Sequence, residues 1–241
     1  MFLRRMARSL FTRMWEGPSL DRLIPPEIRN DSFYSAIVRV AATSGVRHML
    51  EIGSSAGDGS TEAFIEGALM NPTRPTLHCI EVSDIRFEAL RKRHASRPFV
   101  QCHHASSVPL EKVASAAEVT DFYHSVPSTL NEYPLKTVLG WLEQDVKYII
   151  EHELDSNGIR DIKNAFGVKT FDAVLIDGSE FTGSAELNEV YGASHILLDD
   201  IRTFKNYANF ARLSADPDYE LIETSVHVRN GYAVFRLAAK A

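Results

Sequence analysis

The sequence predicts an α/β fold built on a mostly parallel, seven-stranded sheet. Three features support this prediction: short apolar runs alternate with helical segments, the first run leads into a glycine-rich loop, and the last two runs form a hairpin pattern. Alternating strands and helices are typical of parallel strands joined by crossover helices. The five runs interpreted as parallel strands are residues 48–52, 77–82, 99–103, 171–176 and 195–198.

The end of the chain departs from this alternation. Residues 219–228 and 232–237 are two strand-like runs, and Asn230-Gly231 lies between them. The Asn-Gly pair is a strong hairpin signal because both residues accept the backbone conformation of a tight turn. We therefore expect a closing antiparallel hairpin. Ahead of the first strand, residues 33–44 carry apolar side chains at helical spacing and predict a helix.

A long segment separates the third and fourth predicted strands. Residues 105–170 are more than a crossover helix requires, so we place a helical insertion at residues 107–170. Apolar side chains between Leu135 and Ile150 recur at helical spacing and predict a long amphipathic helix within it. Two roles stay open for the insertion: additional packing, or a lid that forms part of a binding pocket.

We interpret the chain as one main domain, residues 33–241, with a basic N-terminal extension, residues 1–32. Arginines and apolar residues are interspersed at the start of the extension, which predicts an amphipathic helix. We expect a capping helix or a chain end of a cytoplasmic protein, with a transit peptide and a helix that contacts a membrane surface as alternatives. Its apolar runs are too short to span a membrane.

Composition narrows the class of protein. With 241 residues, 44% hydrophobic and 24% charged, the chain is typical of a globular protein with a sizeable core. A formal net charge of −6 gives no general attraction to phosphate backbones, so we expect no nucleic-acid partner. Cys79 and Cys102 lack the spacing of zinc ligands and lie in predicted neighbouring buried strands, which fits a reducing compartment. A homodimer is left open.

A glycine-rich loop, residues 51–60, connects the first strand to a predicted helix at residues 61–70. This order of strand, loop and helix distinguishes a ligand-binding loop from a chance cluster of glycines. Glycines at positions 53, 57 and 59 allow a tight turn and the close approach of a ligand to the backbone. The amide-rich N-terminus of the following helix favours an anionic group such as a carboxylate.

The spacing Gly53-x-x-x-Gly57-x-Gly59 differs from the G-x-G-x-x-G pattern that brings a backbone up to the pyrophosphate of a dinucleotide. Together with Glu51, it resembles motif I of class I S-adenosylmethionine-dependent methyltransferases. The resemblance implies a Rossmann-like fold, in which Glu51 organises the loop near the methionine part of the cofactor. The cofactor-binding residues expected in this region are Glu51, Gly53, Ser54, Ser55, Gly57, Gly59 and Ser60.

Glu81 ends the second apolar run, 22 residues after Gly59. A carboxylate at this place can accept hydrogen bonds from both ribose hydroxyls of a nucleoside. In the methyltransferase resemblance, Glu81 stands for the acidic residue that follows the second strand. After the third strand, members of that family contact the adenine amine with a polar residue, and Ser106 is the candidate here.

Carboxylates also follow the fourth and fifth predicted strands. Asp177 comes directly after the fourth strand, and Asp199 and Asp200 end the fifth. Because the carboxyl ends of parallel strands line the ligand crevice of an open α/β sheet, these side chains should lie at the same edge as the glycine loop. Three converging carboxylates repel one another unless a hard cation such as Mg²⁺ lies between them. We expect an Mg²⁺ site, with helix capping and contact with the cofactor's amino group as the alternative.

This arrangement resembles the divalent-metal-dependent O-methyltransferases, which carry an Asp after the fourth strand and an Asp-Asp or Asp-Asn pair after the fifth. The resemblance covers about residues 47–237, with the insertion outside it. It implies that a metal binds two acceptor oxygens and lowers the pKa of the hydroxyl. Ser179 stands where the sugar-specific enzymes carry a further Asp, and we identify no counterpart of the catechol-type lysine. Asp177 and Glu180 are the predicted catalytic residues, with Asp200 as an alternative base.

The predicted function is that of an S-adenosylmethionine-dependent methyltransferase, acting with Mg²⁺ on a hydroxyl of a small molecule or sugar. The sulfonium is already activated, so the protein supplies geometry and help with the acceptor proton. The alternative is a non-catalytic methyltransferase-like domain that binds the nucleoside or a partner. The glycine spacing disfavours an NAD-dependent oxidoreductase. Lys205, past the fifth strand, is interpreted as steering an anionic acceptor or as part of a solvated helix face.

Overall fold

One seven-stranded sheet forms the centre of the chain, in the order β3-β2-β1-β4-β5-β7-β6. The computed structural model describes residue 20 and residues 22–239, so the predicted N-terminal helix lies outside the described residues. β1 to β5 pair in parallel, and β7 is antiparallel to both β5 and β6. The predicted fold class is therefore confirmed. The strands are β1 (His48–Ile52), β2 (Thr76–Glu81), β3 (Val100–His104), β4 (Ala173–Ile176), β5 (His195–Asp199), β6 (Tyr219–Ser225) and β7 (Tyr232–Leu237).

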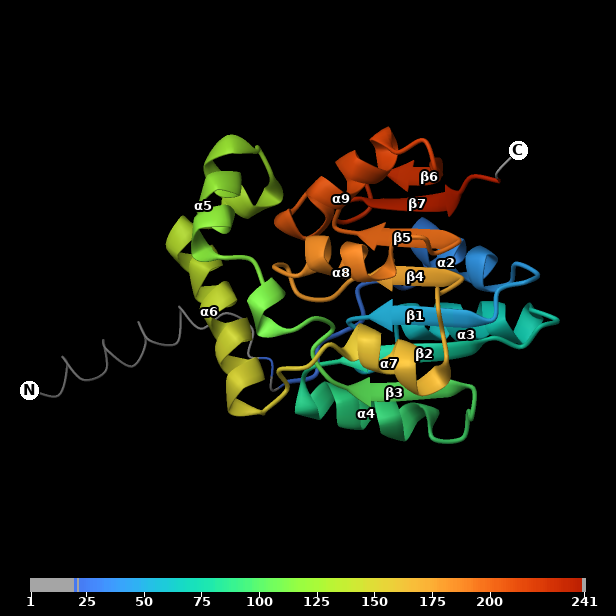
Figure 1. Cartoon of the computed structure of the whole chain (residues 1–241). Coiled ribbons are helices and arrows are strands. Elements are labelled where there is room, and N and C mark those ends of the chain that lie inside the picture. Colours follow the sequence, from blue (N-terminus) through green and yellow to red (C-terminus); the bar gives the residue numbers. More distant parts are fainter. Residues whose placement is uncertain (1–19, 21, 240–241) are drawn as a thin grey trace, which may run out of the picture.

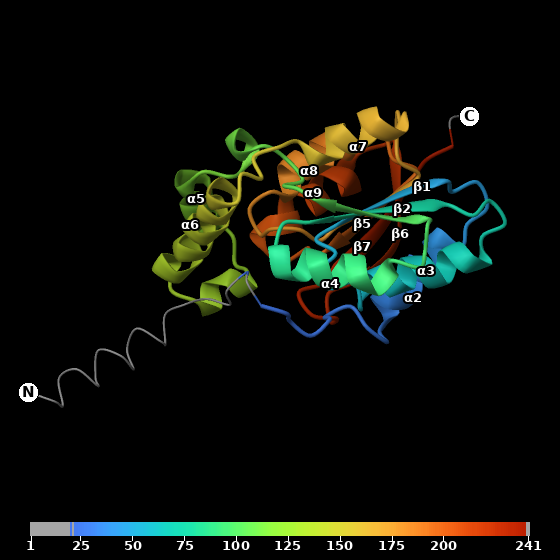
Figure 2. The ribbon, with the colours of Figure 1, turned by 90° about the horizontal axis from the view of Figure 1, so that it is seen from below.

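Helices cover both faces of the sheet. Figure 2 shows α2, α3 and α4 along one face and α7, α8 and α9 along the other. Because both faces are covered, the central strands are almost continuously buried, as the apolar runs predict. Phe33 and Phe64 are fully buried on the first face, and Phe171 and Leu187 lie in the core on the second. The helices are α2 (Ser32–Ala41), α3 (Ser60–Met70), α4 (Asp84–His94), α7 (Gly158–Phe166), α8 (Gly183–Val190) and α9 (Phe204–Ala215).

The insertion forms a helical pair at the carboxyl ends of the parallel strands (Figure 1). Its long helix begins at Leu135, where the apolar pattern predicts it. The pair has a small core of its own, in which Val119, Val138 and Leu142 pack with Phe181 from the loop after β4. The insertion is thereby attached to the sheet at the carboxyl ends of its parallel strands. Its elements are η1 (Leu110–Lys112), α5 (Ala116–Ser125), η2 (Thr129–Glu132) and α6 (Leu135–Glu151).

Several predicted boundaries differ from the observed ones: the predicted helix at residues 33–44 ends at Ala41, and the predicted strand at residues 171–176 begins at Ala173. The insertion ends before residue 170, because α7 is the crossover helix to β4 and its Ile159 and Ile162 pack in the main core. The sixth strand ends at Ser225 instead of residue 228, because Ser225 and Tyr232 are the last paired residues of the hairpin. The intervening residues turn through Arg229, which has a φ of 49°.

Cys79 and Cys102 are neighbours on β2 and β3, as predicted, and both are free cysteines. Within residue 20 and residues 22–239, none of the helices has the length and hydropathy needed to cross a membrane.

Candidate functional site

A cavity of about 300 Å³ lies where β1, β2 and β4 end, beside the insertion. One of its walls is the segment that leads to α2, residues 24–28. The residues just before this segment are bound to the start of α4, since the N-cap residue Ser83 donates from Oγ to the carbonyl of Leu20 (2.6 Å) and Arg86 Nε donates to that of Arg22 (3.0 Å). Of the predicted cofactor-binding residues, those that line the cavity are Gly53, Ser54, Ser55, Gly59, Ser60, Glu81, Ser106 and Asp177.

Gly53 is the point where the loop touches the end of β4. Its φ is +85°, and a Cβ atom on it would lie 2.1 Å from the carbonyl oxygen of Asp177. Gly57, with a φ of +74°, faces α4 instead, where a Cβ would meet His94 Nε2 at 2.6 Å. Both positions require glycine for two reasons, the left-handed backbone and the lack of space.

Glu51 supports the loop from beneath. Its side chain is fully buried, and its Oε2 accepts a hydrogen bond of 2.7 Å from Thr61 Oγ1 in the first turn of α3. Glu51 and Gly57 lie outside the residues that line the cavity. The organising role expected of Glu51 therefore fits its position, while direct contact between Glu51 and a cofactor stays a prediction.

Glu81 lies on the cavity wall next to the glycine loop, with 4% of its surface exposed. Its Oε2 accepts from the amide of Ser55 (2.7 Å), and its Oε1 accepts from the amide of Ser83 (2.8 Å). Burial raises the pKa of the Glu81 carboxyl, and these amide hydrogen bonds oppose the rise. A carboxylate has about four acceptor positions, so Glu81 keeps acceptor capacity for a ligand after binding backbone amides. The hydroxyl of Ser55, which also lines the cavity, has no partner among the described residues.

Ser106 lies on the cavity wall after β3 and is 4% exposed. Its hydroxyl donates to the carbonyl of Val108 at 2.6 Å. The hydroxyl hydrogen is therefore in use, and the oxygen keeps its capacity to accept from an N–H group of a ligand. This geometry suits the predicted contact with an adenine amine.

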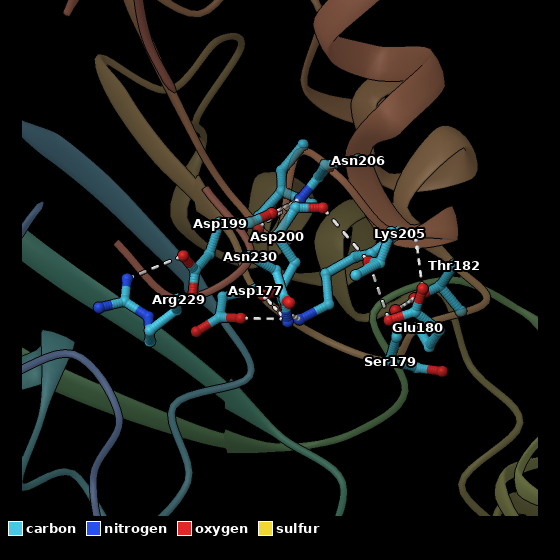
Figure 3. A network of polar contacts seen from close by, with 12 residues as sticks. Asp177, Ser179, Glu180, Thr182, Asp199, Asp200, Lys205, Asn206, Arg229 and Asn230 are labelled. Atoms are coloured by element: carbon cyan, nitrogen blue, oxygen red, sulfur yellow. Dashed lines mark hydrogen bonds and ion pairs between the residues drawn. The ribbon is translucent and has the colours of Figure 1, made fainter. Parts of the chain in front are cut away.

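The three predicted metal ligands meet at the ends of β4 and β5. One carboxylate oxygen from each of Asp177, Asp199 and Asp200 lies within 4.8 Å of the others. Lys205, in the first turn of α9, extends into the same cluster (Figure 3). Its Nζ lies 2.8 Å from Asp177 Oδ1 and 2.8 Å from Asp200 Oδ2. Asp177, Asp200 and Lys205 all line the cavity.

Asp199 is bound by a second cation of the chain. Arg229 Nη2 donates to Asp199 Oδ1 at 2.8 Å, and Arg229 also pairs with Asp31, the residue that caps α2. Burial and the neighbouring Asp200 carboxylate raise the pKa of Asp199 to about 6. Arg229 opposes this rise and prevents Asp199 from being an unpaired buried charge.

Lys205 sets the charge balance of the cluster. Burial lowers its pKa, but the carboxylates of Asp177 and Asp200 more than offset burial and hold the pKa of Lys205 well above its usual range. Burial raises the pKa of Asp177, whereas Lys205 keeps the pKa of Asp200 below its usual range although burial opposes this. Lys205 is therefore a buried ammonium between carboxylates. A solvated helix face does not describe it, so that alternative is wrong, while a role of Lys205 toward an acceptor stays a prediction.

Glu180, the other predicted catalytic residue, is bound to the start of α9. Its Oε1 accepts from the amide of Lys205 (3.1 Å), and its Oε2 accepts from Thr203 Oγ1 (3.1 Å). Burial raises the pKa of Glu180 to about 7. Among the described residues it lies outside the cavity lining, so its position is that of a helix cap, and a catalytic role for it stays a prediction.

The insertion contributes a residue that the sequence analysis missed. Asp145, on α6, lines the cavity, and its Oδ2 accepts from Ser179 Oγ at 2.6 Å. Burial raises the pKa of Asp145 to about 6. Ser179, noted in the sequence only as the replacement of an expected Asp, is thus half of a pair whose acid comes from another helix. Amphipathic spacing identifies α6 but does not show which of its polar residues reaches the cavity.

Three observations bear on the predicted Mg²⁺ site. Each of the three carboxylates already gives an oxygen to a cation of the chain, Lys205 or Arg229. An ion bound at the usual distance of about 2.1 Å from those oxygens would lie against the Lys205 ammonium. Asp199 has only 2% of its side chain exposed. The donor set does not fit a resident Mg²⁺ with Lys205 in this position, and a metal site stays a prediction.

Comparison of the sequence with models of protein families and with curated proteins gives no match. Solved structures do match. An O-methyltransferase from Bacillus cereus in complex with SAH superposes with a TM-score of 0.52 at 12% identity, covering 89% of this chain and 84% of that one. The SAH-bound Podospora anserina methyltransferase PaMTH1 has a TM-score of 0.52 at 14% identity, covering 88% and 81%.

A methyltransferase from Geobacter sulfurreducens has a TM-score of 0.51 at 12% identity, covering 88% of this chain and 81% of that one. Identities this low show that the folds are similar and carry no information about the site residues. The strand order and the closing hairpin agree with this similarity. The chain therefore has the Rossmann-like fold of the class I methyltransferases.

Proposed function

We propose that this chain is an S-adenosylmethionine-dependent methyltransferase that transfers the methyl group to a hydroxyl oxygen of a small molecule or sugar. The observation that carries the proposal is Glu81, a buried acid at the end of β2 that faces the same cavity as the glycine loop after β1. A ribose diol needs a paired acceptor, and the cofactor's methionine part needs close access to the backbone. The fold shared with SAH-bound methyltransferases supports the same assignment.

The residues at the ends of β1, β2 and β3 divide the binding of the cofactor among them. The free lone pairs of Glu81 would accept from the ribose hydroxyls, and the oxygen of Ser106 would accept from the adenine amine. Gly53 lets the chain pass close to the methionine part, and the N-terminus of α3 favours its carboxylate. When bound, S-adenosylmethionine supplies a methyl group already activated on a sulfonium.

The acceptor would enter between the carboxylate cluster and the insertion. Asp177, Asp200 and Lys205 provide a polar wall there, and Val113 and Ile149 of the insertion provide an apolar wall. A hydroxyl compound with an apolar body fits such a surface. The protein orients this oxygen and excludes water, and both effects lower the barrier for direct displacement.

The test is isothermal titration of the purified chain with S-adenosylhomocysteine, comparing wild type with Glu81→Ala. We expect micromolar binding by wild type and a loss of at least about tenfold in Glu81→Ala, because a hydrogen bond to a charged group contributes about 1.5–3 kcal/mol. Thermal unfolding of the variant checks that it folds, because Glu81 also holds two backbone amides.

The matched control is Glu88→Ala on the exposed face of α4, where Glu88 pairs with Arg91. Its affinity for S-adenosylhomocysteine should equal that of wild type. Binding of NAD in place of S-adenosylhomocysteine would refute the proposal. Binding of S-adenosylhomocysteine without turnover of any hydroxyl acceptor would instead favour a non-catalytic nucleoside-binding domain.

A further inference from the structure

Lys205 occupies the centre of the group that the sequence predicts to hold a metal. Its side chain is only 8% exposed, and Asp177 and Asp200 flank its Nζ at equal distances of 2.8 Å. Both acids come from the ends of parallel strands, while the lysine comes from the helix that follows β5. Figure 3 shows the lysine side chain extending to Asp177 and Asp200.

The ammonium has a donor to spare. A lysine ammonium carries three N–H groups. Asp177 and Asp200 accept two of them, and Lys205 lines the cavity. The third N–H is therefore available to an oxygen atom in the cavity. A divalent ion would offer such an oxygen the same two things, a positive charge and a fixed position.

The position of Lys205 is enforced by its neighbours. Glu180 accepts from the Lys205 amide and fixes the start of α9. Asn206, the next residue, donates from Nδ2 to the carbonyls of Ile176 (3.0 Å) and Asp199 (2.6 Å), which ties α9 to the ends of β4 and β5. The helix therefore has little freedom to withdraw the lysine and leave the carboxylates to a metal ion.

We propose that the Lys205 ammonium replaces the divalent ion in this site, so that it binds the acceptor oxygen and the reaction needs no metal. This inference rests on the proposed methyltransferase function. The acceptor O–H bond breaks, and its proton passes to a carboxylate oxygen of Asp177. The oxygen forms a bond to the methyl carbon as the carbon–sulfur bond breaks, and that bond's electron pair goes to sulfur. The ammonium stabilises the negative charge that develops on the acceptor oxygen.

The test measures the binding of Mn²⁺ alone by electron paramagnetic resonance, comparing wild type with Lys205→Met. Methionine keeps the length of the side chain without its charge. We expect wild type to bind Mn²⁺ no more tightly than about millimolar, and Lys205→Met to bind it at least about tenfold more tightly, since Asp177 and Asp200 then lose their cation. Micromolar binding of Mn²⁺ by wild type, abolished in Asp200→Asn, would overturn the proposal.

Two further variants control this measurement. Lys205→Arg keeps a positive charge and should gain no Mn²⁺ affinity. Lys147→Met removes an exposed lysine of α6 that pairs with Glu151, and it should behave as wild type. If Lys205→Met does not fold, the wild-type titration still decides between a site that holds Mn²⁺ and one that does not.

The same samples separate this inference from the proposed function. Titration with S-adenosylhomocysteine tests the cofactor site without involving Lys205. If the cofactor analogue binds and Mn²⁺ also binds wild type tightly, the function survives and the lysine proposal fails. For any hydroxyl acceptor that is methylated, the rate should be unchanged by EDTA. In Lys205→Met, kcat should fall at least about a hundredfold with the KM for S-adenosylmethionine unchanged. Loss of activity in EDTA would refute the proposal.

Discussion

The two halves of the cavity are built in opposite ways. At the ends of β1 and β2, Gly53 and Ser55 present backbone to the cavity, and the buried carboxylate of Glu81 is held by backbone amides. At the ends of β4 and β5, charged side chains from distant parts of the chain meet, and Lys205 balances Asp177 and Asp200 while Arg229 balances Asp199. The first half depends on local backbone conformation. The second depends on compensation between charges, so each member needs the others.

The largest loss of stability is expected for a substitution at Gly53, where the two halves of the cavity touch. Gly53→Ala would place a Cβ 2.1 Å from the Asp177 carbonyl oxygen at a φ of +85°. Overpacking costs about 1–3 kcal/mol and the left-handed backbone about 1–2 kcal/mol, so we expect a loss of about 4 kcal/mol in the free energy of unfolding. Chemical denaturation measures it.

Gly45→Ala separates the two contributions. Gly45 has a φ of +94°, but a Cβ there would meet nothing within 4 Å. We expect this variant to lose only the backbone contribution, about 1 kcal/mol. An equal loss of stability in Gly45→Ala and Gly53→Ala would contradict the close contact inferred between Gly53 and the Asp177 carbonyl.

Removing a cation from the charged cluster at the ends of β4 and β5 should lower the free energy of unfolding strongly. Arg229→Met leaves Asp199 buried with no guanidinium beside it. Breaking a buried pair costs about 3 kcal/mol, and we expect that loss at pH 8, where Asp199 is ionised. The pKa of Asp199 is already about 6, so the loss should shrink toward pH 5 as Asp199 binds a proton.

Urea denaturation at the two pH values measures this difference. Arg236→Met is the control, because Arg236 pairs with Glu220 on the surface, with half or more of each side chain exposed. It should change the free energy of unfolding by less than about 1 kcal/mol at either pH. Equal losses of stability in Arg229→Met and Arg236→Met would show that the buried ion pair contributes no more than the exposed one.

A smaller, pH-dependent effect is expected for Asp145→Asn. Burial raises the pKa of Asp145 from 3.8 to about 6, so the folded chain binds more protons than the unfolded chain between these pH values. Stability therefore falls as pH rises through this window, and the variant avoids that loss. As the pH rises from 4 to 7, the free energy of unfolding of the variant should increase by about 1–2 kcal/mol relative to that of wild type. An equal difference in the free energy of unfolding between variant and wild type at pH 4 and pH 7 would contradict the prediction.

The smallest change in stability is expected on the insertion, away from both halves of the cavity. Gly140 is an exposed glycine within α6, and a Cβ there would meet nothing within 4 Å. Gly140→Ala should stabilise the chain by about 0.5–1 kcal/mol through helix propensity alone, measured by denaturation. Its affinity for S-adenosylhomocysteine should not change. A change in affinity would mean that α6 adjusts when the cofactor site is filled.

Local sequence patterns predict those parts of the site whose residues lie close together in the chain. The loop at residues 51–60 follows a strand directly, and Glu81 ends the next strand, so both could be assigned before their contacts were known. The convergence of Asp177, Asp199 and Asp200 also followed from topology, because parallel strands end at one edge. Local pattern and strand direction are enough for such predictions.

Local patterns do not predict the role of a side chain when that role depends on packing against distant parts of the chain. From the sequence, Lys205 is interpreted as steering an anionic acceptor or as part of a solvated helix face, because nothing local shows that it turns into the cluster. Its place five residues after Asp200, at the start of the helix after β5, was the one available signal. Asp145 and Arg229 were missed for the same reason, as their partners lie 34 and 30 residues away.

The sequence by itself determined the strands, the hairpin, the glycine loop and the acids at the strand ends, because backbone propensity and apolar periodicity are local properties. Only the tertiary structure decided which of those acids receive a cation and which face the cavity. The physical reason is that a buried charge is stable only with a partner, and the partner is selected by how helices pack over the strand ends. In this chain α9 supplies that partner as Lys205.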